Sequence, residues 1–123
     1  MEFHHILIVD DSSTSRMIIE RCFQIAGYAN ASYYFAENGL DAFTSLECNK
    51  TVDLIVTDLN MPKMDGENFI KKLKIDKRTG VIPVLVISSV GDGAVEKILN
   101  ELGVLGIIKK PISPAKILGV LGG

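Results

Sequence analysis

The chain has 123 residues, enough for one domain with a single buried core. Hydrophobic residues make up 47% of it, and 13 basic against 15 acidic residues give a net charge of −2. This balance argues against non-specific binding to nucleic acid or to an anionic membrane, and the apolar runs are too short to cross a bilayer. The start of the sequence does not resemble a secretory signal, and Cys22 and Cys48 show no Cys-x-x-Cys spacing. We therefore expect a cytoplasmic protein with reduced thiols.

Five short apolar runs recur along the chain and predict five strands. They cover residues 6–9, 33–35, 54–56, 84–87 and 105–108. Four of the runs are rich in branched aliphatic residues, as expected of parallel strands that are covered on both faces. The run at residues 33–35 is more aromatic and less uniform, which favours an edge strand.

Apolar residues at helical spacing lie between these runs. In the first such segment Ile18, Cys22, Ile25 and Ala26 predict the buried stripe of a helix that Gly27 ends. Residues 95–102, ended by Gly103, predict a second clear helix, and shorter stripes fall at residues 40–46, 69–73 and 117–121. The alternation predicts an α/β fold with a doubly wound five-stranded parallel sheet and helices on both faces. In such a sheet the functional crevice lies beyond the carboxyl ends of the strands.

Acidic residues stand at two of these strand ends. Asp10 and Asp11 follow the first strand, and Asp58 ends the third. If the two strands are neighbours, like charges about 4 Å apart repel by roughly 4 kcal/mol at an effective dielectric constant of 20, so the cluster favours a bound cation. Oxygen ligands without nearby His or Cys favour Mg²⁺. Each aspartate alone could instead cap a turn or helix, but three at strand ends favour a site.

The remaining strand ends carry a hydroxyl and an ammonium group. Ser88 follows the fourth strand and Lys110 the fifth. A carboxylate nucleophile, a divalent cation, a lysine and a hydroxyl are the groups that phosphoryl transfer requires, because the reaction depends on positioning and on neutralising phosphoryl charge.

The chain resembles the receiver domains of two-component response regulators, in particular the chemotaxis regulators, from about Ile6 to Leu121. The most specific segment is Asp58 to Gly66, which is similar to the family's phosphoacceptor loop almost letter for letter. The acidic pair 10–11 and the segments Glu37-Asn38-Gly39, Ile82-Pro83 and Lys110-Pro111 match further family motifs in order. The resemblance implies one receiver domain over residues 1–123 with the flavodoxin-like strand order 2-1-3-4-5.

The resemblance also implies a role for each site residue. Asp58 is the phosphoacceptor, and Ser88 and Lys110 are the other catalytic residues, which contact the phosphoryl group. The implied Mg²⁺ ligands are Asp11, Asp58 and the backbone carbonyl of Asn60, and Asp10 binds the ion directly or through water. The domain catalyses its own phosphorylation and dephosphorylation but turns over no metabolite.

The partners implied are a sensor histidine kinase or phosphotransfer protein and an unidentified output partner. The output partner would bind the face formed by the helix at residues 95–102, the strand at 105–108 and the last helix, and neither nucleic acid nor a membrane is an expected partner. Gly119, Gly122 and Gly123 leave open whether the chain stands alone or is part of a longer regulator.

Three alternatives are weaker. Ser12 to Ser15 could form a flavin phosphate loop, but the preceding aspartates would repel that phosphate and the chain has no Trp. Capping of the first helix explains these hydroxyl groups better. Phosphohydrolases with an aspartyl phosphate carry a second acid where this chain has Asn60. A receiver that is never phosphorylated is disfavoured by the complete set of site residues.

In many receivers the position of Ile107 holds an aromatic residue whose ring moves on activation. Because Ile107 has no ring, we expect switching to depend on residues 89–93, which contain two glycines.

Overall fold

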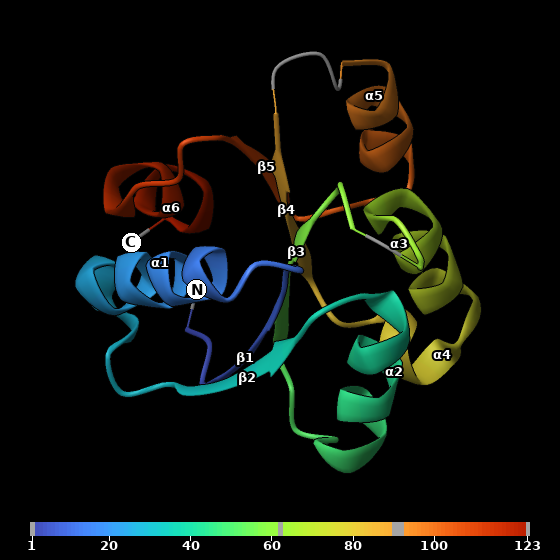
Figure 1. Cartoon of the computed structure of the whole chain (residues 1–123), viewed down its shortest axis with the longest axis horizontal. Helices are drawn as coiled ribbons and strands as arrows, with labels where there is room; N and C mark the ends of the chain where they lie inside the picture. The colour runs from blue at the N-terminus through green and yellow to red at the C-terminus, as the bar shows by residue number, and fades with distance from the viewer. Residues whose placement is uncertain (1, 62, 90–92, 123) are drawn as a thin grey trace.

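The computed structural model describes residues 2–61, 63–89 and 93–122, and within them it contains a five-stranded parallel sheet with helices on both faces (Figure 1). The strands are β1 (His5–Val9), β2 (Ser32–Ala36), β3 (Leu54–Asp58), β4 (Val84–Ser88) and β5 (Gly106–Lys109). The helices are α1 (Ser13–Phe23), η1 (Gln24–Tyr28), α2 (Gly39–Cys48), α3 (Gly66–Ile75), α4 (Lys77–Gly80), α5 (Gly93–Glu101) and α6 (Pro114–Leu121). No helix in the described residues is long and apolar enough to span a membrane.

The strand order is β2-β1-β3-β4-β5, so the expected doubly wound sheet and its order are confirmed. The aromatic strand β2 lies at the edge, as predicted. The strand order reverses between β1 and β3, because β2 is added on one side of β1 and the later strands on the other. β1 and β3 pair in parallel from Ile6 opposite Leu54 to Val9 opposite Thr57. This pairing brings the end of β1 next to the end of β3, where the acidic residues stand.

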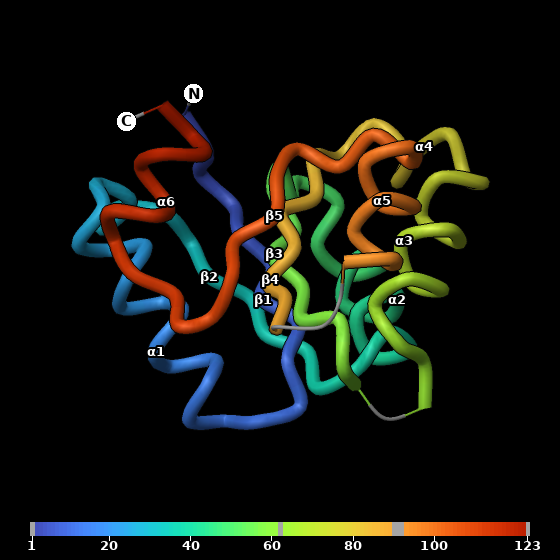
Figure 2. Tube along the Cα trace, turned by 90° about the horizontal axis from the view of Figure 1, so that it is seen from above, coloured from blue at the N-terminus to red at the C-terminus, as the bar shows by residue number. Residues whose placement is uncertain are grey.

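Alternate residues of each strand face different helical layers, because side chains of a strand point to opposite faces of the sheet. Ile6 and Ile8 pack in a core with α1 and α6, whereas Leu7 and Val9 pack in a core with α2, α3 and α5. Figures 1 and 2 both show α1 and α6 on one side of the sheet and α2 to α5 on the other. The sheet is therefore covered on both faces, which explains the continuous apolar character of its central strands.

The predicted buried stripe of α1 was wrong at two of its four positions: Ala26 is buried and Cys22 packs against the core, but Ile18 and Ile25 face solvent. Ile18 and Ile25 are 51% and 61% exposed, whereas Ile19, Phe23 and Ala26 are buried. Adjacent Ile18 and Ile19 permit two helix orientations, and the orientation observed buries the large Phe23 ring against β1 and β3. The predicted helix end is close to the one observed, because Gly27 has a φ of 113° inside the wide turn η1.

A short helix, α4, follows α3 directly, and the sequence pattern did not predict it. Asp76 has an extended backbone that ends α3, and its side chain accepts a hydrogen bond from the Arg78 backbone N–H at the start of α4. The loop expected to rearrange covers residues 89–93, and residues 90–92 of it lie outside the described residues.

Candidate functional site

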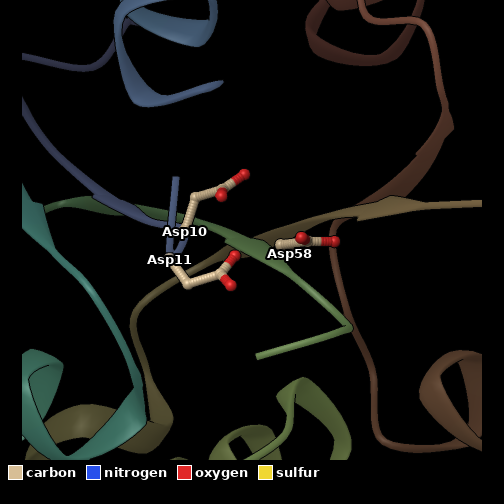
Figure 3. Close-up of side chains that lie close together, drawn as sticks. All are labelled: Asp10, Asp11 and Asp58. Carbon is tan, nitrogen blue, oxygen red and sulfur yellow. The ribbon is translucent and has the colours of Figure 1, made fainter. Parts of the chain in front are cut away.

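Three aspartates converge at the carboxyl edge of the sheet. Asp10, Asp11 and Asp58 each offer a carboxylate oxygen, and these atoms lie within 4.8 Å of one another (Figure 3). Asp10 and Asp58 are 2% and 4% exposed, whereas Asp11 is exposed to solvent. The residues expected to form an acidic cluster therefore do so, with one side open to solvent.

Asp10 is held by groups that follow it directly in the chain. One carboxylate oxygen accepts the Ser12 backbone N–H at 2.9 Å, and the other accepts the Ser15 hydroxyl at 2.6 Å. The Arg16 guanidinium donates to the backbone carbonyl of Asp10 at 2.7 Å. Ser12 also caps α1 by accepting the Ser15 N–H, as predicted for this hydroxyl-rich segment. Asp10 is thus fixed in place by the first turn of α1.

Asp58 is a buried carboxylate with a lysine against it. The Lys110 ammonium lies 3.3 Å from each of its two carboxylate oxygens, and the Asn60 backbone N–H donates to one of them at 3.5 Å. Burial raises the pKa of Asp58, the Lys110 charge opposes this, and the nearby Asp10 charge adds to it. A cation placed among the three aspartates would stabilise their ionised forms.

Ser88 lies at the predicted strand end but faces a partner that the sequence did not indicate. It is completely buried at the end of β4, and its hydroxyl donates to the Glu96 carboxylate of α5 at 3.1 Å. The same Glu96 oxygen pairs with the Lys109 ammonium of β5. Adjacent Lys109 and Lys110 therefore serve different carboxylates, Glu96 and Asp58.

The loop after β3 must return very close to the strand that carries Asp58. The Gly66 N–H donates to the Leu59 carbonyl at 2.9 Å. A Cβ atom on Gly66 would lie 2.6 Å from the Asp58 carbonyl oxygen and 2.8 Å from the Leu59 Cα, closer than packed atoms tolerate. Glycine at this position is therefore a steric requirement of the loop that carries Asn60. Asn60 itself is exposed beside the cluster, and Pro62 of the same motif lies outside the described residues.

The segment after β5 is held on its other side by α6. The Lys116 ammonium donates to the carbonyls of Lys109 and Pro111 at 3.0 and 2.7 Å. The Lys110–Pro111 peptide bond is cis. These contacts fix the backbone on both sides of Lys110.

Four residues of this region were missed by the sequence reasoning: Ser15, Arg16, Glu96 and Lys109. The sequence predicted only a helix-capping role for the segment that contains Ser15. The spacing of Ser15 from Asp10 was the one available signal that its hydroxyl donates to the Asp10 carboxylate. Nothing in the sequence linked Glu96 to Ser88 or to Lys109, because their contact depends on how α5 packs against β4 and β5.

The aspartate cluster thus lies at the switch point of a doubly wound sheet, where such folds bind ligands, and the Lys110 side chain reaches Asp58 from the end of β5. Residues 6–121 match the response regulator receiver domain family. The chain belongs to this family, whose general function is that of a phosphoryl-accepting signalling switch in two-component systems.

Similar proteins agree with this assignment. The chain is 37% identical over 109 residues to chemotaxis protein CheY1 of Helicobacter pylori, which covers 89% of this chain and 86% of that protein. It is 34% identical to a chemotaxis protein CheY homolog of Campylobacter jejuni, with 95% and 92% covered. The structure of chemotaxis response regulator CheY4 of Vibrio cholerae superposes with a TM-score of 0.82 at 25% identity and covers 98% of both chains. The chain is thus a receiver domain of the chemotaxis-regulator type.

Proposed function

We propose that this chain is a single receiver domain over residues 1–123 that accepts a phosphoryl group on Asp58. The observation that supports this most directly is the position of Asp58. Its carboxylate is buried among two other aspartates and contacts the Lys110 ammonium at 3.3 Å. Of the three aspartates, Asp58 is the one with a lysine placed to neutralise an attached phosphoryl group.

The proposed reaction is a transfer to oxygen. A carboxylate oxygen of Asp58 forms a bond to phosphorus, and the bond between phosphorus and a histidine nitrogen or an acyl oxygen of the donor breaks. The donor leaves with the electron pair of that bond, and Asp58 becomes a mixed anhydride. Hydrolysis by water later restores the carboxylate and releases inorganic phosphate, which makes the domain a self-resetting switch.

Mg²⁺ is the cofactor that the donor set fits. Three carboxylates within 4.8 Å, one of them facing solvent, offer the oxygen ligands that Mg²⁺ prefers while leaving room for its water molecules. The proposed ligands are Asp10, Asp11 and Asp58 with the Asn60 backbone carbonyl. When bound, the ion neutralises charge on the phosphoryl oxygens. Lys110 then orients the Asp58 carboxylate, and the Ser15 hydroxyl fixes one carboxylate oxygen of Asp10.

The physiological donor in this proposal is a histidine kinase or a phosphotransfer protein. The output partner binds the face formed by α5, β5 and α6. The relatives with the highest identity quoted above are named chemotaxis proteins, which supports a protein partner in preference to DNA. The cytoplasmic location expected from the sequence stays a proposal.

The test is phosphorylation by acetyl phosphate with Mg²⁺, followed by intact-mass measurement. The wild type should gain one phosphoryl group and lose it on standing, and Asp58→Asn should gain none. Asp65→Asn is the matched control, because Asp65 lies in the same loop and caps α3, and asparagine caps a helix as well as aspartate does. Equal labelling of wild type and Asp58→Asn would show that another residue is the phosphoacceptor. An unlabelled wild type would show that the domain binds its partners without being phosphorylated.

A further inference from the structure

We infer that Glu96 of α5 holds the Ser88 hydroxyl in the resting orientation and so opposes phosphorylation of the domain. This inference deepens the proposed function and rests on it. In the unphosphorylated structure the Ser88 hydroxyl donates to the Glu96 carboxylate at 3.1 Å. Glu96 is a positioning residue in this inference, because it acts on the phosphoryl site only through Ser88.

The Ser88 hydroxyl group carries a single proton. Ser88 can donate one hydrogen bond, and both a carboxylate and a phosphoryl oxygen can only accept. Ser88 is completely buried, so no bulk water is available to supply a substitute donor at that position. Glu96 and a phosphoryl group on Asp58 therefore compete for the same proton.

The Glu96 carboxylate is well placed to win this competition in the resting state. Its side chain is only 19% exposed, and a hydrogen bond to an ionised group is stronger than one between neutral groups. Phosphorylation adds a more highly charged acceptor beside Lys110, and the hydroxyl can then turn toward it. The orientation of the Ser88 hydroxyl is thus set by which group is the stronger hydrogen-bond acceptor, the Glu96 carboxylate or the phosphoryl group.

Lys109 makes the exchange reversible. Its ammonium pairs with the same Glu96 oxygen that accepts the Ser88 proton, so this oxygen keeps a partner after Ser88 leaves. The Lys109 side chain is 47% exposed, which leaves the pair accessible from the surface of α5 and β5. A protein that binds this surface and draws Glu96 toward itself would release Ser88, and by thermodynamic reciprocity it would bind the phosphorylated domain more tightly.

The experiment measures the affinity for beryllofluoride, a phosphoryl mimic, in the presence of Mg²⁺ by amide NMR titration. Glu96→Ala should bind about tenfold more tightly than wild type, the change expected when one hydrogen bond to a charged group no longer opposes binding. Glu96→Gln, which keeps the side-chain size and a neutral acceptor, should show a smaller increase in the same direction. Glu101→Ala, on the same helix, should bind like wild type, since Glu101 has no hydrogen bond or ion pair among the described residues.

The decisive comparison repeats the measurement in a Ser88→Ala background. With no hydroxyl to compete for, Glu96→Ala should no longer change the affinity. An equal increase in both backgrounds, or no increase for Glu96→Ala and Glu96→Gln in the wild-type background, would overturn the inference while leaving the proposed function intact. If the wild type itself binds no beryllofluoride, the proposed function fails and the inference fails with it.

Discussion

The two halves of the site are held by different kinds of contact. At the ends of β1 and β3, Asp10 is fixed by Ser12 and Ser15, which lie two and five residues away in the chain. At the ends of β4 and β5, Ser88 and Lys109 meet on Glu96, which lies eight and 13 residues from them on a separate helix. The position of the Asp10 carboxylate depends on one turn of chain, whereas the contacts of Ser88 and Lys109 depend on the packing of three elements, β4, α5 and β5.

This difference suits two tasks. A metal site needs ligands that are in place before the ion arrives, and the first turn of α1 holds the Asp10 carboxylate in place. A switch needs an element with two arrangements of similar free energy, and a hydroxyl shared between competing acceptors provides one. We therefore expect substitutions in the first half to change metal binding, and substitutions in the second half to change the response to phosphorylation.

The largest expected effect comes from Asp11→Ala. Removing this carboxylate should weaken Mg²⁺ binding by more than about 100-fold, beyond the 10- to 100-fold loss that is usual for a residue supporting a ligand. Isothermal titration with Mg²⁺ measures this directly. Because Asp11 is exposed, the free energy of unfolding without metal should not fall. An unchanged Mg²⁺ affinity would show that the acidic half is not a metal site.

A smaller loss is expected from Ser15→Ala. Without its hydroxyl, one oxygen of Asp10 loses its 2.6 Å donor, and the Mg²⁺ affinity should fall about tenfold. Ser13→Ala is the control, because Ser13 lies in the same turn of α1 but makes no hydrogen bond to Asp10 among the described residues. Beryllofluoride affinity at saturating Mg²⁺ should change little. Equal losses in both variants would mean that the whole turn, and not the Ser15 hydroxyl, positions Asp10.

The smallest expected effect is on stability and depends on pH. Burial raises the pKa of Asp58, so the folded state binds the proton more tightly than the unfolded state does. The free energy of unfolding attributable to Asp58 therefore falls as pH rises from its ordinary pKa, near 3.9, through the raised value, and it stays lower above that. Asp58→Asn should be more stable than wild type at pH 7 in the absence of metal, and the difference should narrow toward pH 4.

The free energy of unfolding of wild type and Asp58→Asn, measured by urea unfolding with a chelator at several values between pH 4 and pH 8, checks this prediction. Asp53→Asn, at the opposite end of β3, serves as the contrast: the Asp53 carboxylate accepts two backbone N–H groups, the NH₂ of asparagine cannot accept either, and this variant should therefore be less stable than wild type at pH 7. A lower stability of Asp58→Asn at pH 7 would mean that the contact with Lys110 outweighs the cost of burying the charge.

Part of this molecule could be predicted from the order of its residues. Parallel strands end at the same edge of a sheet, so residues directly after them are brought together by the fold itself. This is why the convergence of Asp10, Asp11 and Asp58, and the approach of Lys110, followed from sequence position. The core residues of α3, such as Phe69 and Leu73, were equally predictable from their spacing, and both are fully buried.

Other features were decided only by the tertiary structure. The face that α1 buries depended on which of Ile18 and Ile19 turned inward, and the helical spacing alone permits both choices. The partner of Ser88 depended on where α5 places Glu96 and on which side of β5 Lys109 projects. Such contacts join side chains whose distance is set by the packing of separate elements, and no local pattern in the chain encodes that distance. The sequence by itself therefore determined where the acidic cluster forms, whereas the tertiary structure determined which carboxylate accepts the Ser88 hydroxyl proton.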